Sequence, residues 1–299
     1  MNLPKSSLSI GVLVLNYNTW DLALRAMEAA IRLEGENVQE YVLFDDGSSK
    51  PPPAEIDKNI RVVRSESNLG FARALGAAFA EMKSEIVVLF DSDAYVLTPF
   101  ASQVRKRFEE EHDLGQLGFL SQDDDGRPTE SFFSEPDRWS LLLGQKVHGW
   151  VPKHLPQPSN ICVITGCMAT RMNAYRQIGG FDEKFDFLDV DVDYSVRLRH
   201  NGWKVDVEPS IRVFHVGGGT AQLQRHRVLR FYKTRWYLLR KHNLIGNPRV
   251  ARRVILARLR FEELILRLFA PLLYRSPAIR SEKLLGRRDV ISYCREYYH

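Results

Sequence analysis

Two aspartates separated by one serine form the strongest candidate for a chemical site in this chain. Asp91-Ser92-Asp93 directly follows the apolar run Ile86–Phe90, which predicts a buried strand. Because the chain turns where a strand ends, both carboxylates are able to face one hard cation. Mg²⁺ and Mn²⁺ prefer such oxygen ligands and also bind nucleotide phosphates. A turn or a helix cap uses the same pattern, so the neighbouring segments decide between these interpretations.

Polar residues also follow a second apolar run, Tyr41–Phe44. In Asp45-Asp46-Gly47-Ser48, the Asp45 carboxylate is suited to accept hydrogen bonds from a nucleobase imide or a ribose hydroxyl. Asn68 begins a predicted helix whose first amides, together with Arg73, suit a diphosphate. A simple turn and a capped helix are the alternatives for these two segments.

A third acidic segment offers a candidate base. Asp189, Asp191 and Asp193 alternate with valines, so they would share one face of an extended segment. If a helix begins at Asp193 instead, Asp191 projects from the preceding loop. A hydroxyl group that attacks a substrate has a pKa far above neutral and needs a base beside it, for which Asp191 is our candidate. Calcium binding and helix capping are the alternatives.

His215 follows the apolar segment Ile211–Phe214 and precedes three glycines at positions 217–219. A neutral imidazole binds divalent metals well, so we predict that His215 is a metal ligand. A hydrogen-bonded core histidine is the alternative.

The elements that must position these groups alternate in type along the first half of the chain. We expect strands at Ser9–Leu15, Tyr41–Phe44, Ile60–Val63 and Ile86–Phe90, with helices at Leu22–Leu33 and Asn68–Met82. This order is typical of a parallel sheet with crossover helices, which binds ligands beyond the carboxyl ends of its strands.

The second half gives a less regular pattern. We expect loops over residues 121–160, a strand at Ile161–Thr165, and helices at Asn173–Ile178 and Asp191–His200. From Arg225 the pattern is helical, with breaks at Gly246–Pro248, Pro271 and Pro277.

Composition places the 299-residue chain among globular proteins, with 44% hydrophobic and 26% charged residues. The three cysteines have no metal-ligand spacing, which fits a reducing compartment. Met1–Ser9 lacks the apolar core of a signal peptide, and Gly11–Leu15 is too short to span a bilayer. We therefore expect a cytoplasmic protein.

Charge is distributed unevenly. Residues 225–299 carry 19 Lys and Arg against 5 Asp and Glu, whereas residues 1–224 have a net charge of −9. Within the basic part, Val250–Tyr274 mixes apolar residues with arginines at helical spacing. Such a helix suits the headgroup plane of an anionic membrane, and docking on the catalytic domain or on a second subunit are the alternatives. No nucleic-acid recognition motif accompanies the basic charge, so we expect no nucleic-acid partner.

Taken in order, seven segments resemble the family-2 inverting glycosyltransferases. They are Leu15-Asn16-Tyr17-Asn18, Asp45-Asp46-Gly47-Ser48, Asn68-Leu69-Gly70-Phe71, Asp91-Ser92-Asp93, Gly179-Gly180-Phe181-Asp182-Glu183, Asp191-Val192-Asp193 with Arg197, and Val213-Phe214-His215. The resemblance implies an α/β fold of the GT-A type, a Rossmann-like mixed sheet with flanking helices, over residues 1–222. Residues 223–299 would then form a basic helical extension.

The resemblance also implies a nucleoside-diphosphate-sugar donor and a divalent metal, Mn²⁺ or Mg²⁺. By it, Asp191 is the general base, and the metal ligands are Asp91, Asp93 and His215. The donor-binding residues are Asn18, Asp45, Asn68, Arg73, Asp91 and Ser92. The chain departs from the family at Val190, where a glutamate is usual, so Asp189 is the alternative base.

The segment Arg230–Arg235, with Leu238–His242, is similar to bacterial rhamnosyltransferase-like members. We predict an inverting, metal-dependent hexosyl- or deoxyhexosyltransferase of polysaccharide biosynthesis, which acts on a saccharide or a lipid-linked glycan. Peripheral contact with the cytoplasmic face of the inner membrane and a homo-oligomer are further expectations. The alternatives are a GT-A-like binding protein without activity, and a nucleotidyltransferase. The latter would need a Gly-rich triphosphate loop, which Asn16–Trp20 does not offer.

Overall fold

The computed structural model describes residues 7–144, 160–215, 224–274 and 276–299. The chain divides into two compact units. The larger comprises Met1–Glu135 and Pro156–Gly219, and the smaller comprises Pro136–Leu155 and Thr220–His299. The two units are described separately below, and the expected boundary at residue 222 stays a prediction.

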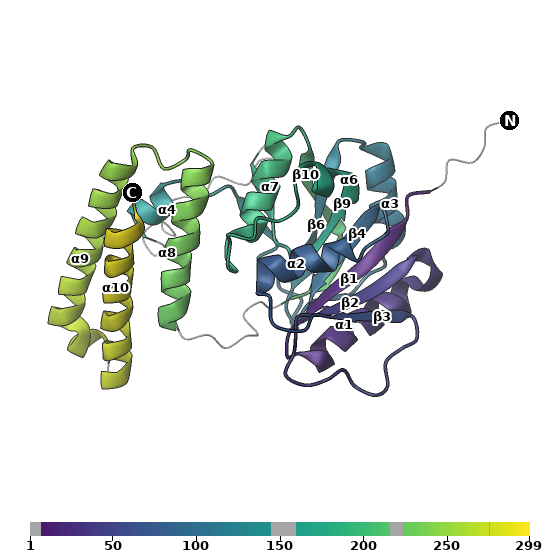
Figure 1. Cartoon of the computed structure of the whole chain (residues 1–299), viewed down its shortest axis with the longest axis horizontal. Helices are drawn as coiled ribbons and strands as arrows, with labels where there is room; N and C mark the ends of the chain where they lie inside the picture. Colours follow the sequence, from purple (N-terminus) through teal and green to yellow (C-terminus); the bar gives the residue numbers. More distant parts are fainter. Residues whose placement is uncertain (1–6, 145–159, 216–223, 275) are drawn as a thin grey trace. The chain divides into compact units, whose positions relative to one another are not determined.

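A mixed sheet forms the centre of the larger unit (Figure 1). Within the described residues it has eight strands in the order β3-β2-β1-β4-β9-β6-β10-β5. Their bounds are β1 (Ile10–Asn16), β2 (Glu40–Asp45), β3 (Ile60–Arg64), β4 (Ile86–Asp91), β5 (Tyr95–Val96), β6 (Leu114–Gln122), β9 (Cys167–Arg171) and β10 (Lys204–Phe214). The first four strands are mutually parallel, whereas β9 runs antiparallel between β4 and β6. A separate ladder joins β7 (Phe132–Ser134) to β8 (Ile161–Val163).

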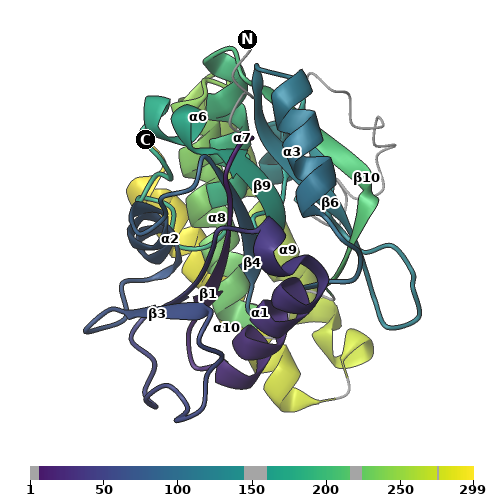
Figure 2. The ribbon, with the colours of Figure 1, turned by 90° about the vertical axis from the view of Figure 1, so that its right-hand side faces the viewer.

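Two helices cover one face of this sheet, α1 (Trp20–Glu34) and α3 (Ala101–Glu110), which lie in front of the strands in Figure 2. Alternate residues of β1, namely Ile10, Val12 and Val14, pack against them in one buried cluster. This alternation follows from the two-residue period of a strand and fixes which side chains of β1 face α1.

Three further helices, α2 (Phe71–Ala80), α6 (Met172–Gln177) and α7 (Val190–His200), are joined by aromatic contacts. The ring centroids of Phe79 and Tyr175 lie 4.6 Å apart, as do those of Phe181 and Tyr194. The Tyr194 hydroxyl also hydrogen-bonds to Thr170 of β9 at 2.5 Å. These contacts attach the beginning of α7, and with it the acidic segment, to the sheet.

The smaller unit is helical, as expected. It contains α4 (Trp139–Leu142), α8 (Gln224–Lys241), α9 (Pro248–Leu273) and α10 (Pro277–Tyr297). Asn247 accepts a hydrogen bond from the Arg249 amide at 3.0 Å, and Pro248 takes the first helical position of α9. The C-terminus is held by Tyr298, whose ring stacks on Trp236 with centroids 3.8 Å apart. No helix in the described ranges combines the length and the apolar character that a bilayer crossing requires.

Three sequence expectations were wrong. Residues 121–160 are not all loop, because β6 extends to Gln122 and β7 and α4 follow it. The segment Asp189–Asp193 is neither extended nor the site of a helix that begins at Asp193, since α7 starts at Val190. Helix α9 also continues through Pro271 to Leu273, because a proline in the last turn removes one backbone hydrogen bond and only two helical residues follow it.

Candidate active site

The carboxyl ends of the four parallel strands lie next to one another and carry polar residues. Asn16 at the end of β1 is the register partner of Asp45 at the end of β2. Asp45 is in turn the partner of Arg64 on β3, and Leu15 is the partner of Asp91 on β4. The strand register therefore produces a row of polar groups that are far apart in the sequence.

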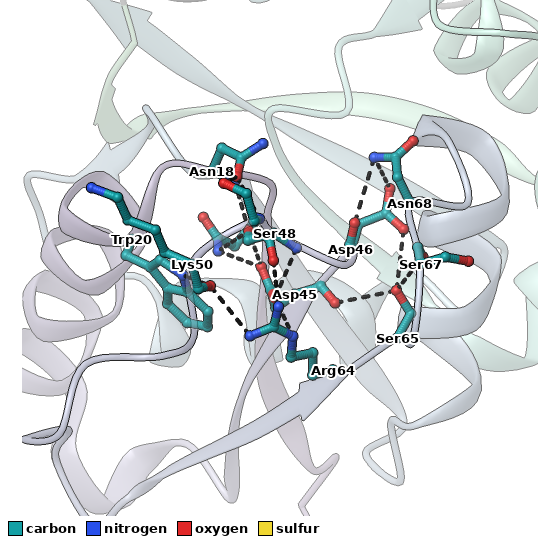
Figure 3. Close-up of polar contacts among 12 residues, drawn as sticks. Asn18, Trp20, Asp45, Asp46, Ser48, Lys50, Arg64, Ser65, Ser67 and Asn68 are labelled. Atoms are coloured by element: carbon teal, nitrogen blue, oxygen red, sulfur yellow. Dashed lines mark hydrogen bonds and ion pairs between the residues drawn. The ribbon is translucent and has the colours of Figure 1, made fainter.

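Asp45 is the centre of this row and is fully buried (Figure 3). Its carboxylate accepts hydrogen bonds from Asn16 Nδ2 at 2.7 Å, from the Ser48 amide at 3.2 Å and from the Ser48 hydroxyl. Arg64 Nε lies 3.3 Å from Asp45 Oδ2, and the same guanidinium donates to the Lys50 carbonyl at 3.2 Å. Asp45 thus fixes the loop after β2, while its predicted contact with the donor stays a prediction.

The hydrogen-bonded row continues from Asp45 to the metal triplet. The Thr19 hydroxyl lies 2.9 Å from Asn16 Oδ1 and 2.9 Å from Ser92 Oγ. Asn18 has a left-handed backbone conformation with φ 59°, and its backbone N–H donates to Ser48 Oγ at 2.7 Å. Asn18 and Ser92, both predicted to bind the donor, therefore belong to one network with Asp45.

Asp46 occupies the amides that the sequence assigned to a diphosphate. Its carboxylate accepts from Asn68 Nδ2 at 3.0 Å (Figure 3). It also accepts from the backbone amides of Leu69 at 2.8 Å and Gly70 at 3.3 Å. Burial raises the pKa of Asp46, and the two amides act in the opposite direction. Helix α2 begins only at Phe71, so Asn68 belongs to the preceding loop, which Asp46 holds.

Arg73 lies on the first turn of α2 and is well exposed. Its Nε is 3.5 Å from Glu183 Oε2, and both side chains are about two-thirds exposed, at 65% and 64%. Phe71, two residues earlier, packs on Phe187 with ring centroids 4.9 Å apart. These two contacts connect the beginning of α2 to the loop that leads into α7.

Asp91, Asp93 and His215 converge as predicted from their positions at strand ends. One potential ligand atom of each residue lies within 4.8 Å of the others. Asp91 ends β4, and its carbonyl accepts from the Ala94 amide at 3.0 Å, which turns the chain so that Asp93 faces the same way. His215 follows β10, and its carbonyl accepts from the Thr129 hydroxyl at 2.7 Å. His215 Nε2 lies 3.7 Å from Asp93 Oδ1.

The electrostatics of this cluster favour a cation. Burial, and then the charge of Asp93, raise the pKa of Asp91 to about 7, because two carboxylates repel each other in a place with little water. Burial lowers the pKa of His215, and the neighbouring Asp93 opposes that shift. Two carboxylates and a neutral imidazole form a donor set that fits Mn²⁺ or Mg²⁺, whose positive charge would favour both ionised carboxylates.

Gly166, in the turn before β9, provides the space around these ligands. A Cβ atom at this position would lie 2.8 Å from Asp91 Oδ2 and 3.1 Å from His215 Cε1. The Gly166 carbonyl also accepts from the Asp91 amide at 3.1 Å, which holds the two backbones together. Any larger residue at position 166 would therefore displace two of the three candidate ligands.

The candidate bases lie at the beginning of α7. Asp189 is the N-cap residue and has φ 65°, an uncommon backbone conformation for a residue other than glycine. Asp191 lies in the first turn and accepts from the Val192 amide at 2.9 Å. Burial, and then the charge of Asp189, raise the pKa of Asp191 to about 7, with a smaller contribution from Asp91.

The third aspartate of this segment has a different environment. Asp193 is fully buried and accepts from Arg197 Nε at 2.6 Å. Arg197 also donates to the carbonyls of Ile178 at 2.9 Å and Gly180 at 2.6 Å. This pair fixes the preceding Gly-Gly turn to α7 and leaves Asp189 and Asp191 as the candidate bases.

The site also contains residues to which sequence reasoning gave no role. Thr19, Arg64 and Gly166 were not singled out at all, and Asn16 and Ser48 only as parts of motifs. For Asn16 and Arg64 a signal existed, because parallel strands of similar length bring their last residues together. Gly166 precedes a strand that runs antiparallel to β4, which the sequence pattern did not predict.

Comparison with known proteins assigns the chain to a family. The glycosyl transferase family 2 profile matches residues 11–179, which is more than half of the chain. The chain is 26% identical over 217 residues to the N-acetylglucosaminyl-diphospho-decaprenol L-rhamnosyltransferase of Mycobacterium tuberculosis. That match covers 62% of this chain and 69% of the relative.

Solved structures share the fold at low sequence identity. A mannosyltransferase from Pyrobaculum calidifontis, in complex with GDP-Man and Mn²⁺, has a TM-score of 0.59 and 15% identity, over 99% of this chain and 89% of the other. GalNAc-T7 with UDP, GalNAc and Mn²⁺ has a TM-score of 0.54 and 15% identity, over 80% and 55%. These likenesses confirm the expected GT-A fold. The mixed sheet, its polar carboxyl edge and the family match together identify the chain as a member of glycosyl transferase family 2.

Proposed function

We propose that this chain transfers a sugar from a nucleoside-diphosphate-sugar to an acceptor hydroxyl, with inversion at the anomeric carbon and with Mn²⁺ or Mg²⁺ bound. One observation carries the proposal. The candidate ligands Asp91, Asp93 and His215 converge at the edge of the sheet, and the charge of Asp91 contributes to the raised pKa of Asp191. A candidate cation site and a candidate base therefore lie within electrostatic reach of each other.

The donor side of the reaction uses the carboxyl edge of the sheet. Asp91, Asp93 and His215 would hold the cation, whose charge neutralises the diphosphate leaving group. The row from Asp45 to Ser92 would orient the loops that contact the nucleoside, with Asn18 and Ser92 as donor ligands. Two solved structures of similar fold, one in complex with GDP-Man and Mn²⁺ and one with UDP, GalNAc and Mn²⁺, support this assignment.

The acceptor side uses the beginning of α7. Asp191 takes the proton from the acceptor hydroxyl while the hydroxyl oxygen bonds to the anomeric carbon from the face opposite the diphosphate. The bond between the anomeric carbon and the diphosphate oxygen breaks, and the nucleoside diphosphate leaves. A pKa of about 7 keeps Asp191 partly ionised and gives it the basicity that this step needs. Burial raises this pKa most, and the charge of the neighbouring Asp189 adds to the shift.

The relative from M. tuberculosis suggests the substrates. Its name combines an L-rhamnosyl group with an acceptor in which a saccharide is linked through a diphosphate to a polyprenol. We infer that L-rhamnose, a deoxyhexose, is the first donor sugar to test, and that the acceptor is a saccharide on a lipid diphosphate. The membrane contact that we expected from the basic helices is consistent with such an acceptor.

The test is to incubate the protein with Mn²⁺, a panel of nucleoside-diphosphate-sugars and a lipid-diphosphate-linked saccharide, and to measure the released nucleoside diphosphate. We expect release with one donor class, no release after chelation of the metal, and restoration by added Mn²⁺. Asp93→Asn should lower the rate at least about a hundredfold because it removes a metal ligand. The matched control, Asp124→Asn, removes an exposed aspartate of the loop after β6 and should have no effect. Transfer that is unchanged by chelation would contradict the metal assignment.

A further inference from the structure

Helix α9 presents a continuous apolar stripe on the surface of the smaller unit. Its members recur at alternating intervals of four and three residues, so they lie on one face of the helix. They are Val250, Val254, Ala257, Phe261, Leu264 and Leu268. The largest are more than half exposed, with Phe261 at 63% and Leu268 at 61%. The stripe is about 27 Å long at 1.5 Å per residue.

The opposite face of α9 already has its partners. Ala251, Ile255 and Leu259 are buried within the smaller unit, where α9 packs against α10. The exposed stripe is therefore a second apolar surface, and it is not needed to hold the three helices together. An apolar surface of this length is uncommon on a protein without an interaction partner.

Arginines accompany the stripe at a fixed interval. Arg253, Arg260 and Arg267 are each exposed, are spaced seven residues apart, and each precedes a member of the stripe by one residue. They form a basic line along one side of the apolar surface. Among the described residues, Arg253 and Arg260 have no acidic partner, whereas Arg267 pairs with Glu263 at 2.5 Å.

The acidic residues of α9 do not offset this charge at the stripe, because arginines of the same unit neutralise them. Glu262 pairs with Arg258, and with Arg287 at 2.8 Å. Glu263 pairs with Arg267, and with Arg288 at 3.2 Å. The apolar stripe therefore has a cationic border and no free carboxylate beside it within the described part of α9.

This charge pattern argues against a second copy of the chain as the occupant of the stripe. In a parallel pair of α9 helices, Arg253 would face Arg258 of the other copy, and Arg260 would face Ile265. In an antiparallel pair, arginines would face arginines. Neither arrangement supplies a negative charge, so the occupant that complements the stripe is both apolar and anionic.

We propose that the α9 stripe binds the surface of an anionic lipid bilayer, with its apolar residues among the acyl chains and its arginines at the headgroup phosphates. A helix with one apolar face and a basic border has the chemistry of such an interfacial segment. Several exposed apolar side chains act together with Arg253 and Arg260, which have no acidic partner in the described part of the chain, and this is the combination that stable peripheral attachment requires. If the acceptor is lipid-linked, which rests on the proposed function, attachment keeps the protein on the surface that contains its substrate.

The test is co-sedimentation of the full-length protein with vesicles of phosphatidylcholine alone or mixed with phosphatidylglycerol. We expect binding to the anionic vesicles, and release when the ionic strength is raised. Phe261→Gln/Leu264→Gln should lower the partition coefficient at least about tenfold through lost apolar burial. Arg253→Gln/Arg260→Gln should lower it about tenfold on anionic vesicles only.

Matched controls separate the stripe from general surface effects. Leu22→Gln/Leu97→Gln removes two exposed leucines from the larger unit, and Arg32→Gln/Lys58→Gln removes the same charge from that unit. Both should bind as the wild type does, and melting curves check that every variant is folded. The proposal is overturned if the wild type binds neither vesicle, if the stripe variants bind unchanged, or if they instead dissociate a dimer or release an acidic protein partner.

Failure of this proposal and failure of the proposed function are distinguishable. Release of nucleoside diphosphate with a water-soluble acceptor does not depend on vesicles, so the stripe variants should retain it. Vesicle binding without sugar transfer would contradict only the proposed function. Transfer without vesicle binding would contradict only the membrane attachment.

Discussion

Gly166 lies against the Asp91 carboxylate so closely that a Cβ atom at position 166 would come within 2.8 Å of Asp91 Oδ2. The same atom would approach His215 Cε1 at 3.1 Å. The absence of a side chain here is therefore a condition for two candidate metal ligands to converge. Because the φ angle of Gly166 is not positive, a substitution at this position causes no backbone strain and tests only the steric effect of the added side chain.

Gly166→Ala should weaken Mn²⁺ binding at least about tenfold and lower transfer by a similar factor, since a displaced ligand costs metal affinity on that scale. Calorimetric titration with Mn²⁺ measures the binding directly. Gly76→Ala is the matched control, because Gly76 lies in α2 with open space around it, and alanine there should leave binding unchanged. Equal Mn²⁺ affinity in both variants would show that metal binding does not require a glycine at position 166.

The pH dependence of the transfer rate should follow the ionisation of the catalytic base. Because Asp191 must be ionised to accept a proton and its pKa is raised to about 7, kcat/KM should rise with pH and level off above that value. Asp189→Asn removes the charge that contributes to this shift, so the rising limb should move to lower pH while transfer persists. If Asp189→Asn abolishes transfer instead, Asp189 is the base.

The stability of the folded protein should also depend on the ionisation of Asp191, but it should fall with rising pH where kcat/KM rises. The pKa of Asp191 is raised in the folded protein, so the folded state binds this proton more tightly, and stability falls as pH rises from about 4 to about 7. Asp191→Asn removes the buried charge and should melt at a higher temperature than the wild type at pH 8. At pH 4 the two proteins should melt at closely similar temperatures. The control Asp124→Asn, at an exposed position, should show no such dependence.

The hydrogen bonds that Asp45 accepts should contribute mainly to the stability of the fold. Asp45→Ala leaves Asn16 and Ser48 without their buried acceptor, which should lower the free energy of unfolding by about 2 kcal/mol. Urea denaturation measures this loss. Thr19→Val removes only the link between Asn16 and Ser92, so it should weaken donor binding with a smaller change in stability. If Thr19→Val is destabilised but binds the donor with unchanged affinity, Thr19 acts on stability and the predicted effect on donor binding is wrong.

The sequence predicted the first four strands and their helices within a few residues, because the apolar runs that form β1 to β4 end in clear polar stops. The convergence of Asp91, Asp93 and His215 was also predictable, since each follows an apolar run. Strand β6 was not predicted, because Gly115 and Gly118 interrupt its apolar pattern. Gly118 is required by packing, as a Cβ there would lie 2.8 Å from a methyl group of Val163.

Other features of the site depend on contacts between segments distant in the sequence. Diphosphate binding by the amides before α2 stays a prediction, and the hydrogen bonds that the Asp46 carboxylate accepts from them depend on tertiary packing, which no local pattern shows. The left-handed conformation of Asp189 also starts α7 earlier than the capping pattern suggested. In both cases the position of a charged group depends on tertiary structure, whereas a sequence pattern indicates only local conformational preference.

The central claim is that Asp191 removes the acceptor proton in a metal-dependent transfer. A single-turnover experiment with Asp191→Asn tests it most directly, with donor affinity measured in parallel by calorimetry. The account predicts an unchanged donor affinity and a rate of transfer that falls at least about a hundredfold, the scale of general base catalysis. Wild-type turnover by Asp191→Asn would contradict it.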